Sequence, residues 1–506
     1  MRTQIAFCIV LSCLLFTSLL AGQISTTSAG SVPRPADATA VAVRPASEYS
    51  YSWLSYLPLV FKASGQGSAP YRVNVPYFDG DVVFSETAIF WFGQVTQTDN
   101  YADVRVGYNS DHLYVRLAAF DRRLWYDTTP SPDDLTAWDA VTLYLDPGGD
   151  DLRTYSQCSG CALSPAERAD YGYGYRFVGQ FNWWEARDSF QAAYRGDDSG
   201  WVLADVPFTT TIGWRGDAPN NDSDDRGWAI IFRIPFTSLG LSGAPAQGTS
   251  WRIGMAMHDR DDVAGPPAAD KTWPDAMAPD SSATWGQLAF GLPSYTAPPS
   301  APGGTVTVRH KLDGETVMDG AVGGGSICGA GLDFWTEWGQ TNYASERNFN
   351  VQNQSDVADW PCFSKYYVTF PLESVPPNKV ILSATLTLHQ IGSAGSSGEA
   401  KSSLIQVLTV AEDWDEATLT WNNAPLAAEN VSQAWVDPIT FPGWPGVVRE
   451  WDVSRAVAEA YAAGESVKLV LYESDSAYHS GKYFVSSDTG DWNAEGRPTL
   501  TVVWGQ

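Results

Sequence analysis

The sequence TAWDAVTLYLDPGGDD, which begins at Thr136, places a tryptophan and several carboxylates around alternating apolar residues. Trp138 and Asp139 come directly before a run in which every second residue is apolar. This alternation predicts a strand with one buried face. The segment contains no obvious nucleophile and no histidine. Three interpretations follow for it: the rim of a catalytic cleft, a metal site, or a flat binding face.

Further carboxylates gather in loops rich in Asp, Asn and Gly. The sequence GDAPNNDSDDRGW spans Gly216–Trp228, and HDRDD at His258–Asp262 follows a predicted strand. Calcium takes about six to eight oxygen ligands from loops of this kind. We expect a structural calcium site with Asp121, Asp139 and Asp259 as ligands, because these residues lie at strand ends beside acidic loops. The alternative for Gly216–Trp228 is a solvated acidic turn.

The sequence lacks a Gly-rich phosphate loop, a His-Glu-x-x-His pair and a Gly-x-Ser-x-Gly elbow. Its five histidines are scattered and are interpreted as strand or turn residues. Paired carboxylates for glycoside hydrolysis stay open as an alternative, because the fold sets their separation. Met255 and Met257 precede His258 in a predicted strand. The two methionines flank Ala256, an alternation typical of a core strand.

The chain is long and strongly acidic. It has 506 residues, with 31 Lys and Arg against 58 Asp and Glu, for a net charge of −27. This charge argues against nucleic-acid binding, which depends on neutralising phosphates. It fits an extracellular protein with calcium sites, although simple solubility is the plainer explanation. Aromatic residues make up 13% of the chain, and 22 are tryptophans, whose exposed rings can serve as platforms for sugars.

The first residues predict export. Residues 1–22 have the pattern of a signal peptide, with Arg2 followed by a long apolar run. A membrane anchor is the rival interpretation. Residues 23–70 are rich in Ser, Thr, Ala and Pro and predict a low-complexity leader. We therefore expect the protein to be extracellular or at the cell surface.

Cysteines outside the predicted signal peptide are even in number, which suggests disulfides in an exported protein. The expected pairs are Cys158–Cys161 and Cys328–Cys362. The alternative for the CSGC sequence at 158–161 is half of a zinc site.

Strand patterns predict an all-β chain with two β-sandwich, jelly-roll-like domains at 71–292 and 305–506. A Pro/Gly/Ser-rich linker at 293–304 separates them. We expect the two domains to fold independently. The sequence NSDH between two alternating runs predicts a hairpin. One helix is predicted in DVSRAVAEAYAAGE, with Asp452 as its cap and an end near Gly464.

Short motifs of the first half, taken in order, resemble the family-9 carbohydrate-binding module of the DOMON-like group. These motifs are VRVGYNSDHLYVRLAAFD, WDAVTLYLD, YGYRFVGQFN, GWAIIFRIPFTSLGL, WRIGMAMHDRDD and WGQLAF. In that family two tryptophans and an arginine hold a terminal sugar. The resemblance implies Trp138, Arg176 and Trp273 as ligand-binding residues. Thr142 stands where the family carries a sugar-binding glutamate.

The second half resembles the DNRLRE domain, which is linked to binding of cell-surface polysaccharide. The matching motifs are KYYVTFPLESVPPNKVILSATLTLHQ, EDWDEATLTWNNAP, WDVSRAV and YFVSSDTGDWNAEGRPTLTV. The two resemblances together imply a secreted or surface protein with two non-catalytic modules. Its partners would be polysaccharides or oligosaccharides, and the cell wall or a secreted glycoside hydrolase. The alternatives are a hydrolase or lyase in carbohydrate catabolism, a haem-binding DOMON-like protein, and a purely structural surface protein. The candidate axial ligands for haem are His112, His258, Met255 and Met257.

Overall fold

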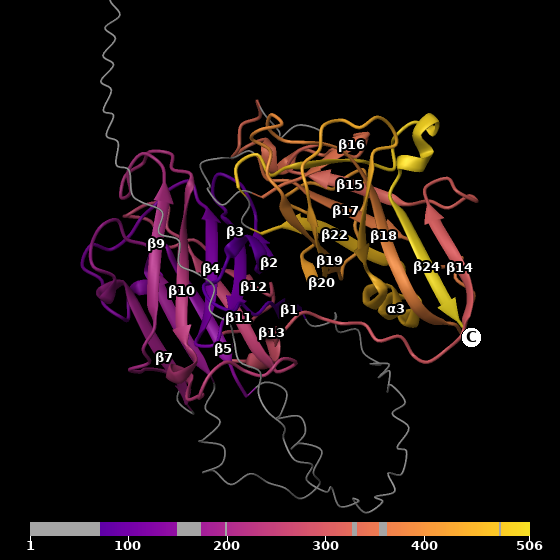
Figure 1. Ribbon diagram of the computed structural model, residues 1–506. Helices are drawn as coiled ribbons and strands as arrows, with labels where there is room; N and C mark the ends of the chain where they lie inside the picture. The colour runs from indigo at the N-terminus through magenta and orange to yellow at the C-terminus, as the bar shows by residue number, and fades with distance from the viewer. Residues whose placement is uncertain (1–70, 149–173, 198–199, 326–330, 354–361, 475–476) are drawn as a thin grey trace, which may run out of the picture. The chain divides into compact units, whose positions relative to one another are not determined.

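The computed structural model describes residues 71–148, 174–197, 200–325, 331–353, 362–474 and 477–506. Nearly all regular structure in these residues is β-strand, which confirms the predicted all-β fold (Figure 1). Among the same residues, none of the helices combines the length and the apolar character that a transmembrane span requires. The predicted signal peptide and leader lie outside the described residues.

The first sandwich packs two sheets around one hydrophobic core. The β11 sheet contains, in spatial order, β1 (Arg72–Val75), β13 (Gly286–Phe290), β11 (Ser250–His258), β5 (Ala140–Asp146), β6 (Tyr175–Gln180), β7 (Gln191–Asp197) and β8 (Gly200–Leu203), with β12 (Lys271–Trp273) paired to β11. The β4 sheet contains β2 (Ala88–Gly93), β3 (Tyr101–Tyr108), β4 (His112–Phe120), β10 (Gly227–Pro235) and β9 (Thr209–Arg215).

The second sandwich also has two sheets around its own core. The β22 sheet contains β15 (Met318–Val322), β17 (Lys365–Phe370), β22 (Val467–Glu473), β19 (Ser403–Val410) and β20 (Ala427–Val436). The β18 sheet contains β14 (Pro302–Arg309), β24 (Thr499–Gly505), β18 (Val380–Ser393), β23 (Lys482–Val485) and β16 (Asn348–Val351), with β21 (Val447–Asp452) paired to β18.

Helical structure is confined to short elements. The predicted helix is α3 (Ser454–Ala463), and Gly464 ends it in the left-handed conformation. Its N-cap residue is Val453, one residue after the predicted cap Asp452, whose carboxylate accepts the backbone N–H of Ser454 at 2.9 Å. The described 3₁₀ helices are η1 (Phe84–Glu86), η2 (Leu135–Ala137), η3 (Arg187–Phe190), η4 (Phe236–Leu239), η5 (Ser282–Thr284), η6 (Trp338–Gln340) and η8 (Asp491–Gly496).

Period-two alternation places the side chains of β5 as the sequence predicts. Val141, Leu143 and Leu145 point into the first core, whereas Thr142 and Tyr144 lie on the opposite face of the sheet. The NSDH hairpin joins β3 to β4, and its Asn109 side chain accepts the backbone N–H groups of residues 111 and 112 at 3.0 and 2.9 Å. Local sequence therefore determines both the strand faces and this turn.

A third hydrophobic cluster contains residues of both sandwiches, so we expect the two sandwiches to unfold together rather than independently. The outer face of the β4 sheet contributes Trp91 and Phe120, and the outer face of the β22 sheet contributes Tyr367 and Tyr472. The two sheets lie side by side in Figure 1. In addition, β1 pairs in parallel with β20, so the β11 and β22 sheets form one continuous sheet.

Lys365 is buried inside this shared cluster. Its Nζ donates to the Tyr101 hydroxyl at 2.6 Å and lies 3.8 and 4.0 Å from the ring centroids of Trp421 and Trp91. Tyr101 in turn donates to the Asp103 carboxylate at 2.6 Å. Burial lowers the pKa of Lys365 well below its usual value, and the negative charge of Asp103 acts in the opposite direction. Lys365 of the second sandwich is thus hydrogen-bonded to Tyr101 of the first, inside a group of aromatic rings.

Candidate functional site

Three strand ends bring together the carboxylates that the sequence predicts as metal ligands. Asp121 follows β4, Asp139 precedes β5 and Asp259 follows β11. Because β5 and β11 are antiparallel, with Ala140 opposite His258, Asp139 and Asp259 lie at the same end of the sheet. One carboxylate oxygen from each of the three aspartates lies within 4.8 Å of the others. We call these residues the acidic cluster.

The acidic cluster is buried, and its charges are poorly compensated. Backbone N–H groups of Arg123, Trp125 and Arg260 donate to Asp121 or Asp139 at 2.6 to 2.9 Å. The Oδ1 atom of Asp259 has no hydrogen-bond partner among the described residues, and Asp259 is 5% exposed. A buried, unpaired carboxylate oxygen is costly without a cation.

Burial shifts the titration of all three carboxyl groups. It raises the pKa of Asp259 to about 7, with the charge of Asp261 as the next cause. Burial, followed by the charge of a neighbouring cluster carboxylate, also raises the pKa of Asp121 and Asp139 well above its usual value. Three acidic oxygens held this closely fit a hard divalent cation such as calcium, which would offset their mutual repulsion.

The Gly216–Trp228 loop has structural partners for its acidic side chains. Asp222 and Asp224 pair with Arg123 and Arg122 at 3.2 and 2.8 Å. Buried Asp225 accepts the backbone N–H groups of residues 124 and 217 at 3.2 and 2.9 Å. These contacts tie the loop to the segment that follows β4. The loop therefore supports the fold next to the acidic cluster, and the carboxylates of Asp222, Asp224 and Asp225 are engaged by arginines and amides.

Trp138 lies directly beside the acidic cluster. The Arg260 guanidinium covers one face of its indole, with the central carbon 4.5 Å from the ring centroid. Arg260 also donates to the Ala137 carbonyl at 3.0 Å, and its backbone N–H donates to Asp139 at 2.9 Å. The cluster thus supports the two segments that position Trp138, a half-buried residue with one face already covered.

Arg176 lies on the outer face of the β11 sheet among aromatic rings. Its guanidinium stacks over Tyr194 at 4.9 Å from the ring centroid, and Tyr144 is its cross-strand neighbour. Its Nε has no hydrogen-bond partner among the described residues. Trp201 and Trp285 lie close to Tyr144, with centroids 5.7 and 5.3 Å away. We call these five residues the Arg176 face.

Trp273 does not belong to the Arg176 face, which corrects the sequence prediction. It is 1% exposed and packs in the first core, with its ring centroid 4.0 Å from that of Phe90. A ring enclosed in this way offers no face to a sugar. Trp201 is the half-buried tryptophan that does lie beside Arg176's neighbours. None of the short motifs contains Trp201, which lies on β8. The pairing of β7 with β8 brings it close to Tyr144.

A Thr–His–Asp chain crosses the same sheet. His258 Nδ1 is hydrogen-bonded to the Asp270 carboxylate at 2.8 Å, and its Nε2 is hydrogen-bonded to the Thr142 hydroxyl at 2.8 Å. Thr142 is fully buried, so its hydroxyl is closed to a substrate. Both ring nitrogens of His258 are engaged, and Met255 and Met257 lie in the first core. These contacts give no support to nucleophilic catalysis or haem ligation at these residues.

A second group of carboxylates, Asp319, Glu416 and Asp488, lies in the second sandwich within the same mutual distance of 4.8 Å. Asp319 accepts the backbone N–H and the hydroxyl of Ser487 at 2.8 and 2.5 Å, and Tyr366 donates to it as well. Burial raises the pKa of Glu416 to about 7, with Asp319 as the next cause. Hydrogen bonds thus satisfy the buried member of this group.

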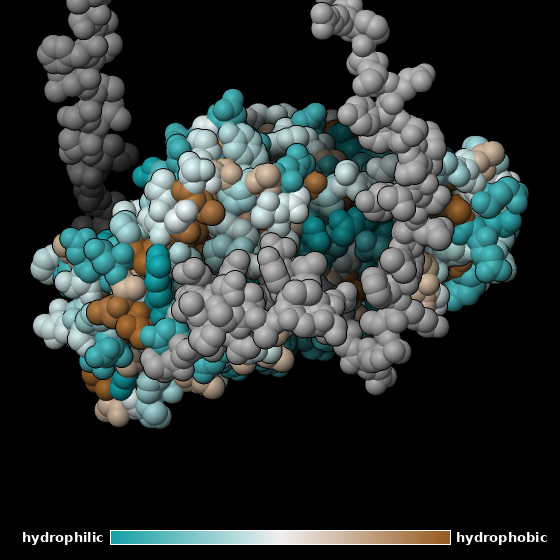
Figure 2. Space-filling view, turned by 90° about the horizontal axis from the view of Figure 1, so that it is seen from below, coloured by the Kyte–Doolittle hydropathy of each residue, from teal (hydrophilic) through white to brown (hydrophobic). Residues whose placement is uncertain are grey.

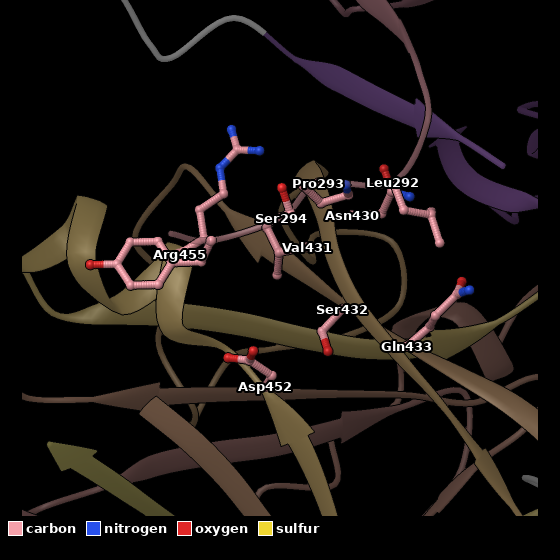
Figure 3. A pocket seen from close by; sticks show the side chains of 10 residues that line it. Leu292, Pro293, Ser294, Asn430, Val431, Ser432, Gln433, Asp452 and Arg455 are labelled. Atoms are coloured by element: carbon pink, nitrogen blue, oxygen red, sulfur yellow. The ribbon is translucent and has the colours of Figure 1, made fainter. Parts of the chain in front are cut away.

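A pocket of about 380 Å³ lies between residues 292–295, which follow β13, and the second sandwich (Figure 3). Its polar groups already serve the fold. Asn430 bonds to Asn74 at 2.7 Å, Asp452 holds the start of α3, and Arg455 pairs with Glu429 at 3.1 Å. The pocket is therefore a seam between segments and a poor candidate for sugar recognition.

Figure 2 shows a face of the molecule on which hydrophobic residues form small, separate patches among hydrophilic ones.

The predicted disulfide partners Cys158, Cys161 and Cys328 lie outside the described residues, so both pairings stay predictions.

Residues 335–502 match the model of carbohydrate-binding module family 96. This confirms, for that segment, the predicted likeness to a carbohydrate-binding module, while the finer assignment to the DNRLRE domain stays a prediction. Among curated proteins, none matches the sequence.

Among solved structures, similar chains include a family-9 carbohydrate-binding module from Caldicellulosiruptor kristjanssonii in complex with cellotriose. It is 18% identical, with a TM-score of 0.27, and the match covers 44% of this chain and 95% of that one. A family-9 module from the same organism in complex with glucose is 18% identical, with a TM-score of 0.28, and the match covers 45% of this chain and 100% of that one. Likenesses this remote assign no ligand to this chain.

Proposed function

We propose that the chain is an exported, non-catalytic protein that binds polysaccharide through two modules. The match of residues 335–502 to a carbohydrate-binding module family carries this proposal. The apolar run after Arg2 supports export, and the intact mass of the secreted protein would test whether residues 1–22 are removed.

In the first sandwich, we propose that Arg176, Trp201 and Trp138 contact the sugar, whereas the buried rings of Tyr144, Tyr194 and Trp285 support Arg176 and Trp201 from within the fold. The planar guanidinium of Arg176 can donate to two adjacent hydroxyls, a geometry that lysine does not reproduce. Stacking on Tyr194 fixes the orientation of the guanidinium plane at the outer face of the β11 sheet. Trp201 adds a half-buried ring nearby. An arginine among aromatic rings is a suitable arrangement for a ligand with hydroxyls and apolar ring faces.

Native affinity electrophoresis against a panel of soluble polysaccharides tests this function. We expect the wild type to be retarded by at least one polysaccharide, with no release of reducing sugar. Arg176→Lys should weaken the retardation. Arg195→Lys is the matched control, because Arg195 stacks on Tyr175 at a similar 5.0 Å. Trp138→Ala should also weaken binding. A wild type that binds no glycan, or that releases reducing sugar, would contradict the proposal.

We further propose that calcium occupies the acidic cluster and stabilises the first sandwich. Asp121, Asp139 and Asp259 would supply carboxylate oxygens, and the unpartnered oxygen of Asp259 supports this assignment. The bound ion would hold together the ends of β4, β5 and β11, and with them the segments that carry Trp138 and Arg260. Its role would be to position these residues.

A further inference from the structure

Three aromatic side chains of the second sandwich are open to solvent. Phe441 and Trp444, in the segment between β20 and β21, are 57% and 45% exposed. Trp492, in η8 just before β24, is 66% exposed. Large aromatic rings are costly to leave in water, and a gathered group of them marks an interaction site more often than scattered ones do. We call these three residues the Trp444–Trp492 corner.

The three rings contact one another. The ring centroids of Trp444 and Trp492 are 5.1 Å apart at an interplanar angle of 85°, and those of Phe441 and Trp444 are 5.3 Å apart at 71°. Two indole planes at a right angle form an inner corner. One ring can stack on the flat side of a ligand while the other closes its edge.

The backbone beneath Trp492 is firmly held. Arg497, which is buried, donates to the Asp491 carboxylate at 2.6 Å and to the Thr489 carbonyl at 2.8 Å. A side chain at Gly490 would meet the Trp492 indole nitrogen at 2.7 Å, so the ring lies directly against this part of the backbone. An aromatic platform held in this way loses little conformational freedom when a ligand binds.

The charges around the corner disfavour an anionic ligand. Asp491 pairs with two cations, Arg497 at 2.6 Å and Lys311 at 3.8 Å. Glu495 in η8 and Glu450 in β21 are exposed carboxylates. A uronate or sulfated sugar would therefore approach these negative charges. The electron-rich ring faces instead suit the C–H groups of an uncharged sugar.

We propose that the Trp444–Trp492 corner is a second glycan-binding site, which takes an uncharged pyranose unit of a soluble β-linked polysaccharide. This inference rests on the proposed function and adds a site and a ligand class to it. A β-linked glucopyranose has equatorial hydroxyls, so its C–H groups project from both flat faces. The right angle between the indoles suits one unit of a flexible chain, because a crystalline polysaccharide surface would require coplanar rings.

The test uses the full chain and the double variant Trp444→Ala/Trp492→Ala. Both side chains are exposed, so we expect the variant to fold as the wild type does. Trp435→Ala is the control, since Trp435 is 51% exposed on β20. Affinity electrophoresis with hydroxyethylcellulose and xylan should show affinity reduced about tenfold or more in the double variant and unchanged in the control. Neither the wild type nor the double variant should bind sodium alginate or microcrystalline cellulose appreciably.

The outcomes separate this inference from the proposed function. A double variant that binds the neutral polysaccharides as well as the wild type does would overturn the corner as a site and leave the proposed function intact. Preferential binding of alginate or of crystalline cellulose would overturn the ligand class. If light scattering shows that the wild type is a dimer and the double variant a monomer, while their glycan affinities are equal, the corner is a self-association surface. A wild type that binds no polysaccharide would overturn both proposals.

Discussion

Replacing Asp259 by Asn removes one negative charge from the acidic cluster at nearly constant volume. Burial raises the pKa of Asp259 from 3.8 to about 7, a change of about three units. At about 1.4 kcal/mol for each unit, keeping this carboxylate ionised costs the metal-free fold up to about 4 kcal/mol. In a chelator at about pH 8, where the carboxylate is ionised, we expect Asp259→Asn to be more stable than the wild type by up to this amount.

The pH dependence has a defined sign. Between the unfolded pKa near 3.8 and the folded pKa of about 7, the folded state binds a proton that the unfolded state has lost. The free energy of unfolding of the metal-free wild type should therefore fall as pH rises through this window. Calcium needs ionised carboxylates, so its stabilisation should grow over the same window. At about a hundredfold excess over the dissociation constant, this stabilisation would be about 2.7 kcal/mol.

Thermal melts followed by circular dichroism, in chelator and in millimolar calcium, measure both effects. Asp205→Asn is the control, because it removes the same charge from an exposed position of the first sandwich. We expect calcium to raise the melting temperature of the wild type and of the control but not that of Asp259→Asn. The reasoning is refuted if Asp259→Asn is the less stable protein in chelator, or if calcium raises all three melting temperatures equally.

The other predictions concern the joined sandwiches and the cysteines. Phe120→Ala removes a buried ring from the cluster shared by the two sandwiches, which should cost about 3–5 kcal/mol. Because both sandwiches contribute to that cluster, urea unfolding should remain a single transition at lower denaturant, and two separate transitions would contradict the coupling. Peptide mapping of the secreted protein should find Cys328 joined to Cys362, whose loop of about 35 residues is worth roughly 3–4 kcal/mol; free thiols at both positions would exclude the bridge.

The acidic cluster illustrates how far local pattern reaches. Asp121, Asp139 and Asp259 each stand at the end of a strand that the alternation of apolar residues predicts. Strand ends of one sandwich meet at its edge, so their proximity was predictable without coordinates. The partners of the Gly216–Trp228 loop were not, because Arg122 and Arg123 lie about a hundred residues earlier in the chain.

Tryptophan roles were decided by the tertiary structure. Trp138, Trp201 and Trp273 are the same residue type near strand ends, and composition cannot separate a ring in the core from one on a sheet face. The pairing of β11 with β12 buries Trp273 against Phe90, whereas the pairing of β7 with β8 brings Trp201 towards Tyr144. The energetic gain from burying an indole depends on contacts with distant segments, which no local pattern contains.

The sequence by itself determined the all-β class, the alternation of β5, the NSDH hairpin and the single predicted helix, because each depends on neighbours a few residues apart. The sequence also contains a pattern that indicates the shared cluster and that the predictions did not use. The strand AIFWFG and the central residues LVLY of the strand VKLVLYE are continuously apolar, a pattern of strands buried on both faces. Only the tertiary structure showed which surface covers the second face. The match between Trp91 and Tyr472 depends on two outer sheet faces meeting across hundreds of residues.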